Sequence, residues 1–192
     1  MIDRLLDLMA IRLRWVSLMA GVLGIGVLWI WISSVPASAT TSGLIPSPRV
    51  GFNAPDFTLE LLGGGELSLS SLRGKAVVIN LWASWCPPCR AEMPAIQAVY
   101  ERNRERGLEV LAVNTTFQDS ERDAALFVQE FDLTFPVPLD RTGSVSRQYQ
   151  LRALPTTFFV DREGVIRKVV IGGPMSETTI QTAVEEILGG GP

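Results

Sequence analysis

The chain contains no histidine among its 192 residues. Without an imidazole, neither a Ser-His-Asp nor a Cys-His catalytic arrangement can form, and the usual zinc sites and most copper sites lose a ligand. Acid–base chemistry therefore falls to carboxylates, thiols or water. We expect no metal ion and no cofactor.

Positive charge is also scarce. The chain carries 17 basic and 20 acidic side chains, for a net charge of -3. Without the first 39 residues, which hold three arginines and two aspartates, the remainder carries 14 basic and 18 acidic side chains. Proteins that bind nucleic acid show the opposite balance, so we exclude nucleic acid as a partner.

Charge of either sign is missing from Trp15 to Pro48. Within this stretch, Trp15 to Ile32 form an 18-residue apolar run. As a helix the run would be about 27 Å long, close to the thickness of the hydrocarbon core of a bilayer. Arginines precede it and no charge follows until Arg49, so the N-terminus should stay in the cytoplasm and the rest should be exported. Residues 1–32 are therefore predicted to be a cytoplasmic N-terminus and a transmembrane anchor or signal sequence.

A cleaved signal peptide is the alternative to an anchor. Ala37-Ser38-Ala39 supplies the small-residue pattern of a cleavage site, shortly after the helix-breaking Pro36. The apolar run is longer than the roughly 7 to 15 residues of a typical signal peptide, which favours a single-pass anchor in the cell membrane. Either way, an extracytoplasmic or periplasmic domain over residues 50–190 follows a Ser-, Thr-, Ala- and Pro-rich linker over residues 33–49.

From Phe57 onward, strand-like and helix-like patterns alternate, which is typical of an α/β domain around a central sheet. Strands over residues 57–62 and 66–69, joined by three glycines, are predicted to form a β-hairpin. The nearly all-apolar segment 76–83 is predicted as a strand covered on both faces. Further strands are predicted over residues 108–114, 156–160 and 165–171. Helices are predicted over residues 87–106, 120–131, 144–149 and 176–188.

Cysteine occurs only twice, as Cys86 and Cys89. Cys86 follows the predicted central strand and begins a helix, where unpaired backbone N–H groups and the helix dipole stabilise a thiolate. The two intervening residues, Pro87 and Pro88, let one helical turn bring the sulfurs into bonding distance. We predict a dithiol–disulfide pair, in which an exposed Cys86 attacks a partner disulfide and a more buried Cys89 resolves the mixed disulfide.

A static disulfide and a zinc site are the alternatives for this pair. Closing a four-residue loop removes only about 2 kcal/mol of chain entropy, which adds little to a domain with its own core. A zinc site needs more ligands than two cysteines can supply. The redox interpretation is therefore favoured.

Three separated motifs resemble those of one family. The segment Asn80 to Pro94, NLWASWCPPCRAEMP, resembles the active-site segment of membrane-associated thioredoxins of the TlpA/ResA type. The segment Gly51 to Phe57 is similar to the opening that this group shares with the peroxiredoxins, and Leu154 to Phe158 to the loop that bears the cis-proline of the family. The resemblance implies an AhpC/TSA-like thioredoxin fold: a central mixed sheet flanked by helices, with an N-terminal β-hairpin extension.

The resemblance also implies roles for the residues around the cysteines. It implies that the peptide bond before Pro155 is cis, although most prolyl peptide bonds are trans. In thioredoxin-like folds this loop faces the cysteines, and its backbone pairs with the bound partner. Trp85 lies either on a docking surface or in the core. The residues expected to support substrate binding are Trp85, Pro87, Pro88, Leu154, Pro155 and Thr156.

Glu92 is the candidate acid–base residue. Helical spacing places Cys89 and Glu92 on one largely apolar stripe, where burial would raise the pKa of the carboxyl group. The alternative is a glutamate at the edge of the stripe that turns its carboxylate to solvent. The resemblance favours catalysis, because the similar proteins have an active-site glutamate at the corresponding position. Where ordinary thioredoxins have a buried aspartate, this chain has Asn80, which we expect to be a hydrogen-bonded core residue.

We predict an exported thiol-disulfide oxidoreductase that reduces specific disulfides of exported proteins. Among proteins of the similar family, apocytochrome c thiols are the usual substrates, as in cytochrome c maturation. A reducing role in an oxidising compartment requires a membrane electron donor. An exported oxidant or isomerase is the main alternative. A peroxidase is less favoured because of the Cys-x-x-Cys motif, and a copper carrier because histidine is absent.

Overall fold

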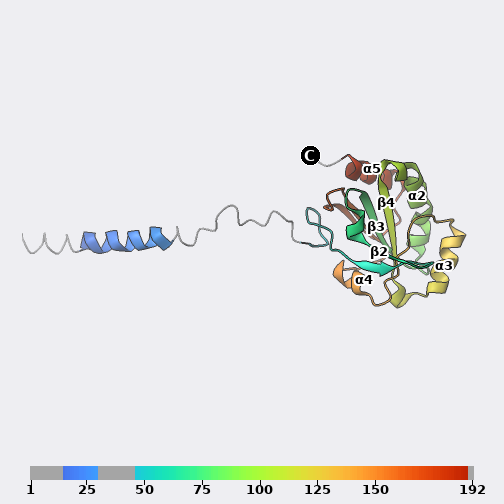
Figure 1. Ribbon diagram of the computed structural model, residues 1–192, viewed down its shortest axis with the longest axis horizontal. Helices are drawn as coiled ribbons and strands as arrows, with labels where there is room; N and C mark the ends of the chain where they lie inside the picture. The colour runs from blue at the N-terminus through green and yellow to red at the C-terminus, as the bar shows by residue number, and fades with distance from the viewer. Residues whose placement is uncertain (1–14, 30–45, 190–192) are drawn as a thin grey trace, which may run out of the picture. The chain divides into compact units, whose positions relative to one another are not determined.

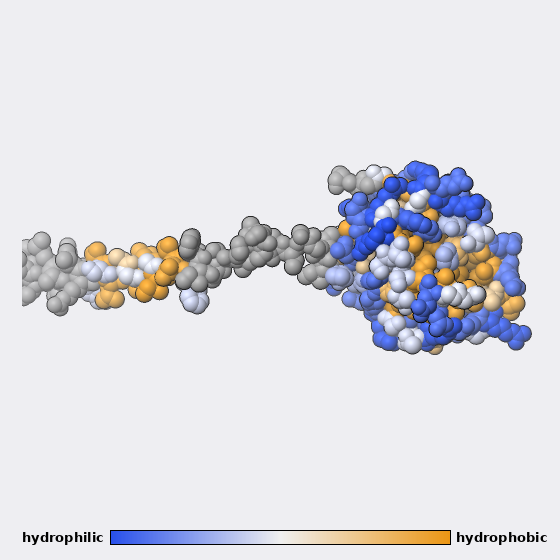
Figure 2. Space-filling view, viewed as in Figure 1, coloured by the Kyte–Doolittle hydropathy of each residue, from blue (hydrophilic) through white to orange (hydrophobic). Residues whose placement is uncertain are grey.

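The computed structural model describes residues 15–29 and 46–189, which belong to two separate units (Figure 1). Residues 15–29 form a helix whose large apolar side chains are each at least 56% exposed, and Figure 2 shows apolar residues along it. No helix within the described residues is both long and apolar enough to cross a bilayer. The predicted span reaches Ile32, and its last three residues, the arginines before it and the cleavage signal lie outside the described residues.

The second unit is built on a four-stranded mixed sheet. Its strands, in spatial order, are β4 (Leu108–Asn114), β3 (Ala76–Trp82), β5 (Thr156–Val160) and β6 (Ile166–Ile171). Strand β3 pairs in parallel with β4 and antiparallel with β5, and β5 pairs antiparallel with β6. The predicted central mixed sheet is therefore confirmed.

Helices cover both faces of this sheet. One face packs against α2 (Pro87–Asn103), α3 (Glu121–Glu130) and α5 (Glu177–Leu188), and the other against α4 (Ser144–Gln148) (Figure 1). All seven residues of β3 are buried, and successive side chains alternate between the two cores. Val78 and Trp82 point toward α2, whereas Ile79 and Leu81 point toward α4. Asn80 lies between Val78 and Trp82 in this alternation, so its side chain also points toward α2 and can reach the residues of that helix.

The helix boundaries follow from their caps. Ser120 and Ser176 cap α3 and α5, each accepting a hydrogen bond through its hydroxyl oxygen from a backbone N–H three residues later. The helix predicted over residues 87–106 is shorter than expected, because α2 ends at Asn103 and the chain continues as the 3-10 turn η3 (Arg104–Arg106). Gly107 then stops it with a φ of 93°, a conformation that suits glycine.

The predicted hairpin is confirmed in shorter form, as β1 (Thr58–Glu60) and β2 (Glu66–Ser68), followed by the 3-10 turn η2 (Leu69–Leu72). An extended segment over residues 137–139, which the sequence patterns did not indicate, joins the hairpin to β4 through backbone hydrogen bonds. Residues 33–45 of the predicted linker over residues 33–49 lie outside the described residues. In the part that is described, Ser47 donates its backbone N–H to the Asn53 carbonyl.

Tyr149 ties the end of α4 to the chain before β1. Its hydroxyl donates to the buried carbonyl of Pro55 at 2.7 Å. Its ring meets the rings of Phe57 and Phe158 edge-on, with centroids 5.8 and 5.0 Å away. A single substitution can remove the hydrogen bond and keep the ring contacts, so that the contribution of the hydrogen bond to stability can be measured alone.

Tyr149→Phe should lower the free energy of unfolding by about 1 kcal/mol, because the ring contacts remain but the Pro55 carbonyl loses its donor. Urea denaturation followed by circular dichroism measures this difference. Tyr100→Phe is the matched control, since within the described residues the Tyr100 hydroxyl has no hydrogen bond; its effect should stay within about 0.5 kcal/mol. Equal losses in the two variants would contradict the assignment.

Candidate active site

The two cysteines lie where β3 leads into α2. Cys86 is the N-cap of α2, and its Sγ accepts a hydrogen bond from the Cys89 backbone N–H at 3.3 Å. The two sulfurs form a disulfide, with the Cα atoms 5.3 Å apart. A thiolate formed at Cys86 by reduction would therefore lie beside a backbone donor and the positive end of the helix dipole.

The burial of the two cysteines differs from the prediction. Cys86 was expected to be exposed, but it is only 2% exposed in this disulfide state, and Cys89 is 0% exposed. The two still differ in access, because Cys86 lines a surface groove and Cys89 does not. Packing of the apolar core around the start of α2 covers most of both side chains.

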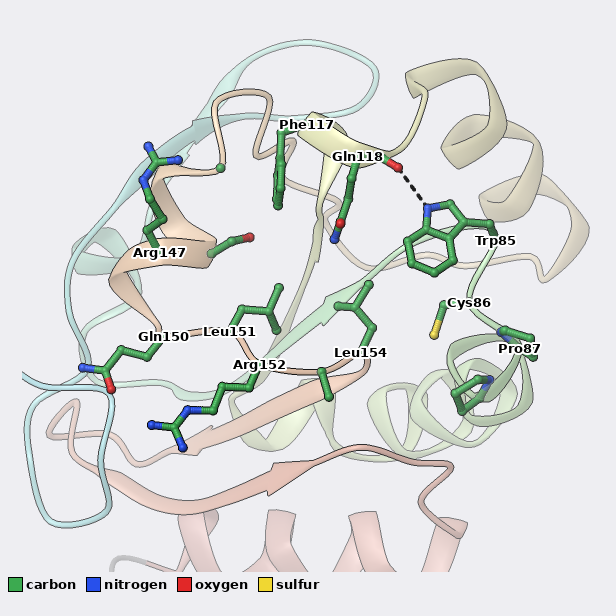
Figure 3. Close-up of a pocket in the computed structure, with 14 residues that line it drawn as sticks. Trp85, Cys86, Pro87, Phe117, Gln118, Arg147, Gln150, Leu151, Arg152 and Leu154 are labelled. Atoms are coloured by element: carbon green, nitrogen blue, oxygen red, sulfur yellow. Dashed lines mark hydrogen bonds between the residues drawn. The ribbon is translucent and has the colours of Figure 1, made fainter.

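The groove beside Cys86 has a volume of about 830 Å³. Figure 3 shows Cys86 and Pro87 at one end of it, beside Trp85. The rest of its wall comes from η4 (Thr116–Gln118), from α4 and from the chain that leads to β5. Of the residues predicted to support substrate binding, four form part of the wall, namely Trp85, Pro87, Pro88 and Leu154.

Trp85 is not a core residue. It is 56% exposed, and its indole N–H donates to the Gln118 carbonyl at 3.0 Å. The hydrogen bond fixes the ring at the mouth of the groove (Figure 3). Pro87 and Pro88 occupy the first two positions of α2, where the missing N–H groups cost no helical hydrogen bond.

Pro155 and Thr156 do not form part of the groove wall. The Leu154–Pro155 bond is cis, as the resemblance implied. The Pro155 carbonyl accepts a hydrogen bond from the Gly172 N–H at 2.8 Å, and the Thr156 hydroxyl donates to the Ala153 carbonyl at 2.7 Å. Both contacts hold the loop in place, while Leu154 alone of the three lines the groove.

Glu92 is fully buried on the inner face of α2, with 0% exposure. Its Oε1 accepts a hydrogen bond from Asn80 Nδ2 at 2.9 Å, and its Oε2 accepts one from the Met175 N–H at 3.1 Å. Burial raises the pKa of Glu92, and the two hydrogen bonds offset only part of that effect. The alternative of a glutamate turned to solvent is therefore wrong.

Asn80 is the hydrogen-bonded core residue that the sequence predicted. Besides Glu92, its Nδ2 reaches Thr157 Oγ1 at 2.8 Å. Its Oδ1 is buried and has no partner within the described residues. The side chain thus joins β3, β5 and α2, and it fixes one oxygen of the Glu92 carboxylate.

Two groups around Glu92 were not predicted. A Cβ atom on Gly173 would lie 2.8 Å from Glu92 Oε2 and 2.8 Å from Pro155 Cγ, so only glycine fits between these side chains. Met175 supplies the second donor to the carboxylate. The Gly173–Pro174 peptide bond is also cis. The sequence Gly172-Gly173-Pro174 indicates a turn, but it does not indicate that this turn contacts α2.

Asp119 holds the loop that leads into Cys86. Its carboxylate accepts hydrogen bonds from the Ser84 N–H at 2.7 Å, the Ser84 hydroxyl at 2.6 Å, Asn114 Nδ2 at 2.8 Å and the Ser120 N–H at 2.9 Å. Burial alone would raise the pKa of Asp119, but these hydrogen bonds outweigh it and hold the pKa below its usual range. Sequence patterns did not reveal this residue, because its two hydrogen bonds to Ser84 join segments 35 residues apart. Within residues 15–29 and 46–189, no three cysteine or acidic side chains group as metal ligands.

The raised pKa of Glu92 predicts a dependence of stability on pH. At a pH between the ordinary glutamate pKa of 4.5 and the higher pKa of Glu92 in the folded state, the folded chain holds a proton that the unfolded chain has released. This contribution to stability is complete below the unfolded value and is lost as the pH rises through the folded value. Glu92→Gln cannot ionise, so as the pH rises above about 4.5 it should lose less stability than the wild type.

Urea unfolding of the oxidised proteins at several pH values measures this difference, with the disulfide intact so that the cysteines do not titrate. Glu105→Gln, a substitution on the exposed surface of η3, is the control and should follow the wild type. A constant offset between Glu92→Gln and the wild type at every pH would contradict the prediction.

Comparison with known proteins places this geometry in a family. The model of the AhpC/TSA family matches residues 50–169. Thiol-disulfide oxidoreductase ResA of Oceanobacillus iheyensis is 43% identical over 65% of this chain and 66% of its own length. The ResA protein of Geobacillus kaustophilus is 39% identical over 72% of this chain and 78% of its own length.

A solved structure agrees with these sequence matches. The thiol:disulfide interchange protein of the thioredoxin family from Chlorobium tepidum superposes with a TM-score of 0.65 at 27% identity, over 71% of this chain and 95% of its own. The fold is thus thioredoxin-like, and the Cys86–Cys89 disulfide lies at the start of α2. The chain belongs to the AhpC/TSA family, in which it is a thiol-disulfide oxidoreductase with a thioredoxin-like fold.

Proposed function

We propose that the chain is an exported reductant of disulfide bonds in other exported proteins, held at the cell membrane by its N-terminal helix. The resemblance to the TlpA/ResA type suggests apocytochrome c as the substrate class, and so a role in cytochrome c maturation. The direction of electron flow, the compartment and the substrates are the proposed parts of this function.

The unequal access of the two sulfurs supports this proposal best. Cys86 lines a groove of about 830 Å³, whereas Cys89 is 0% exposed and contributes nothing to the groove wall. A partner disulfide can therefore approach Cys86 from the groove but cannot reach Cys89 first. We assign Cys86 as the attacking thiol and Cys89 as the resolving thiol.

The reaction then runs in two exchange steps. The Cys86 thiolate attacks one sulfur of the partner disulfide; a new S–S bond forms, the partner S–S bond breaks, and the other partner sulfur leaves as a thiolate. The Cys89 thiolate next attacks Cys86 Sγ, which forms the Cys86–Cys89 disulfide and releases the second partner sulfur. Two electrons pass to the partner, and its two thiolates each take up a proton.

Glu92 is the proposed proton acceptor for Cys89. The Cys89 thiol must lose its proton before it attacks, and Glu92 follows it by nearly one helical turn on the same buried face of α2. A carboxyl group with a raised pKa is a better match for proton exchange near neutral pH than an ordinary one. In the reverse direction the same group would return the proton.

The sequence before residue 46 supports the compartment. The apolar run from Trp15 to Ile32 follows arginines and precedes a stretch without charge, and the described part of this run exposes its apolar side chains. Exported dithiols tend to be oxidised, so each turnover needs two electrons from a dithiol donor in the membrane. We propose such a donor as a partner.

Cys89→Ala should accumulate mixed disulfides between Cys86 and its partners in the native host, because the resolving thiol is gone. Non-reducing electrophoresis and mass spectrometry would identify the adducts. Cys86→Ala is the matched control and should form none. The absence of adducts, together with a wild-type chain that neither reduces nor oxidises a test disulfide, would overturn the proposed function. If the trapped partners are found oxidised in cells that contain the wild-type chain, the chain acts as an oxidant and not as a reductant.

Glu92→Gln should slow disulfide exchange and change its dependence on pH, because the amide cannot accept a proton from Cys89. Proton transfer by a positioned group contributes about 10²-fold or more, so we expect a slowing of at least about tenfold near neutral pH. Stopped-flow reduction of a model disulfide by the pre-reduced chain measures the rates. A rate–pH profile identical to that of the wild type would remove Glu92 from the mechanism.

A further inference from the structure

The groove beside Cys86 is basic, although the chain as a whole carries a net charge of -3. Among the described residues, two arginines, Arg147 and Arg152, contribute to its wall, and no aspartate or glutamate does. Figure 3 shows both arginines at the end of the groove away from Cys86. An anionic group that enters the groove therefore meets positive charge and no carboxylate in the wall.

These two arginines have no ion-pair partner within the described part of the chain. Other arginines of the same unit do form ion pairs, among them Arg90, Arg106 and Arg141. Arg147 donates one hydrogen bond, from Nη1 to the Thr142 carbonyl at 3.0 Å, and Arg152 donates none from its side chain. Most of their guanidinium N–H groups thus remain available to a ligand.

Arg147 is held in place rather than spread over the surface. A Cβ atom on Gly143 would lie 3.1 Å from Arg147 Nη1 and 3.2 Å from the Phe117 ring, so the guanidinium and the ring both lie close to this glycine. Gly143 has a φ of 69°, a conformation that suits glycine, and it directly precedes α4. The position of the positive charge relative to the groove is therefore part of the fold.

The middle of the groove is mostly apolar, although the Gln118 side chain also borders it (Figure 3). Phe117 is 47% exposed, and Leu151 and Leu154 are half-buried beside it. Figure 3 places these three side chains between the arginines and Cys86. A chain segment that enters with its cysteine at Cys86 would meet apolar contacts first and positive charge afterwards.

We propose that the groove selects partner proteins whose segment next to the reactive cysteine carries aspartate or glutamate, which pairs with Arg147 and Arg152. The occupant is an extended segment of a disulfide-bearing protein, with an apolar side chain over Phe117 and acidic side chains at the far end. This selectivity rests on the proposed function, because it concerns the same exchange at Cys86. Charge complementarity of this kind acts mainly on the rate of encounter and on the choice of partner.

Three synthetic peptides with the same internal disulfide and the same apolar residue, differing only in an Asp-rich, Gln-rich or Lys-rich flank, test this selectivity. Single-turnover reduction by the pre-reduced full-length chain gives a second-order rate constant for each. The Asp-rich peptide should react about three- to tenfold faster than the Gln-rich one, and the Lys-rich peptide more slowly. Rising salt concentration should shrink these differences.

Arg147→Gln/Arg152→Gln should abolish the preference, so that this variant reduces the three peptides at similar rates. The matched control is Arg104→Gln/Arg122→Gln, which removes the same charge from exposed positions outside the groove and should keep the preference. The proposal would be overturned if the wild-type chain reduced all three peptides at equal rates. It would also be overturned if both double variants lost the preference for the Asp-rich peptide equally.

Two further outcomes would also overturn it. A wild-type chain that sediments as a dimer, and as a monomer once Arg147 and Arg152 are replaced, would assign the groove to a second copy. A chain that reduces none of the peptides would refute the proposed function as well, whereas equal reduction of all three would refute only the selectivity.

Discussion

Strand β3 is paired along both edges, with β4 in parallel and with β5 antiparallel, and all seven of its residues are buried. This strand fixes where α2 begins. Trp82 anchors its end by donating an indole hydrogen bond to the Ala112 carbonyl at 3.0 Å and by packing its ring against Phe127. Cys86 therefore caps a helix whose start cannot shift without disturbing the centre of the sheet, and the groove lies directly against that start.

The alternation of β3 also determines the polar part of the site. Asn80 shares the α2 side with Val78 and Trp82, so its amide meets Glu92 rather than the core under α4. A buried carboxylate without donors would be costly, and here Asn80 and the Met175 backbone supply one to each oxygen. The arrangement keeps an ionisable group with a raised pKa on α2, the same helix that carries Cys89, and shields it from solvent.

Much of this could be predicted from sequence, because local patterns carry it. The all-apolar β3, the serine caps of α3 and α5, and the spacing of the cysteines each depend on neighbouring residues. What could not be predicted depends on contacts between distant segments, such as Asp119 holding Ser84 and Gly173 fitting between Glu92 and Pro155. The near-complete burial of Cys86 was missed for the same reason, since a motif shows reactivity but not how the core closes around it.

The difference between the two sulfurs is a difference in access, set by which of them borders the groove. Limited alkylation of the freshly reduced chain with iodoacetamide, followed by peptide mass spectrometry, measures that difference for each cysteine in one experiment. The structure predicts that Cys86 is modified first and that Cys89 stays largely unmodified while the fold is intact. Equal modification of both, or faster modification of Cys89, would contradict the assignment of Cys86 as the attacking thiol.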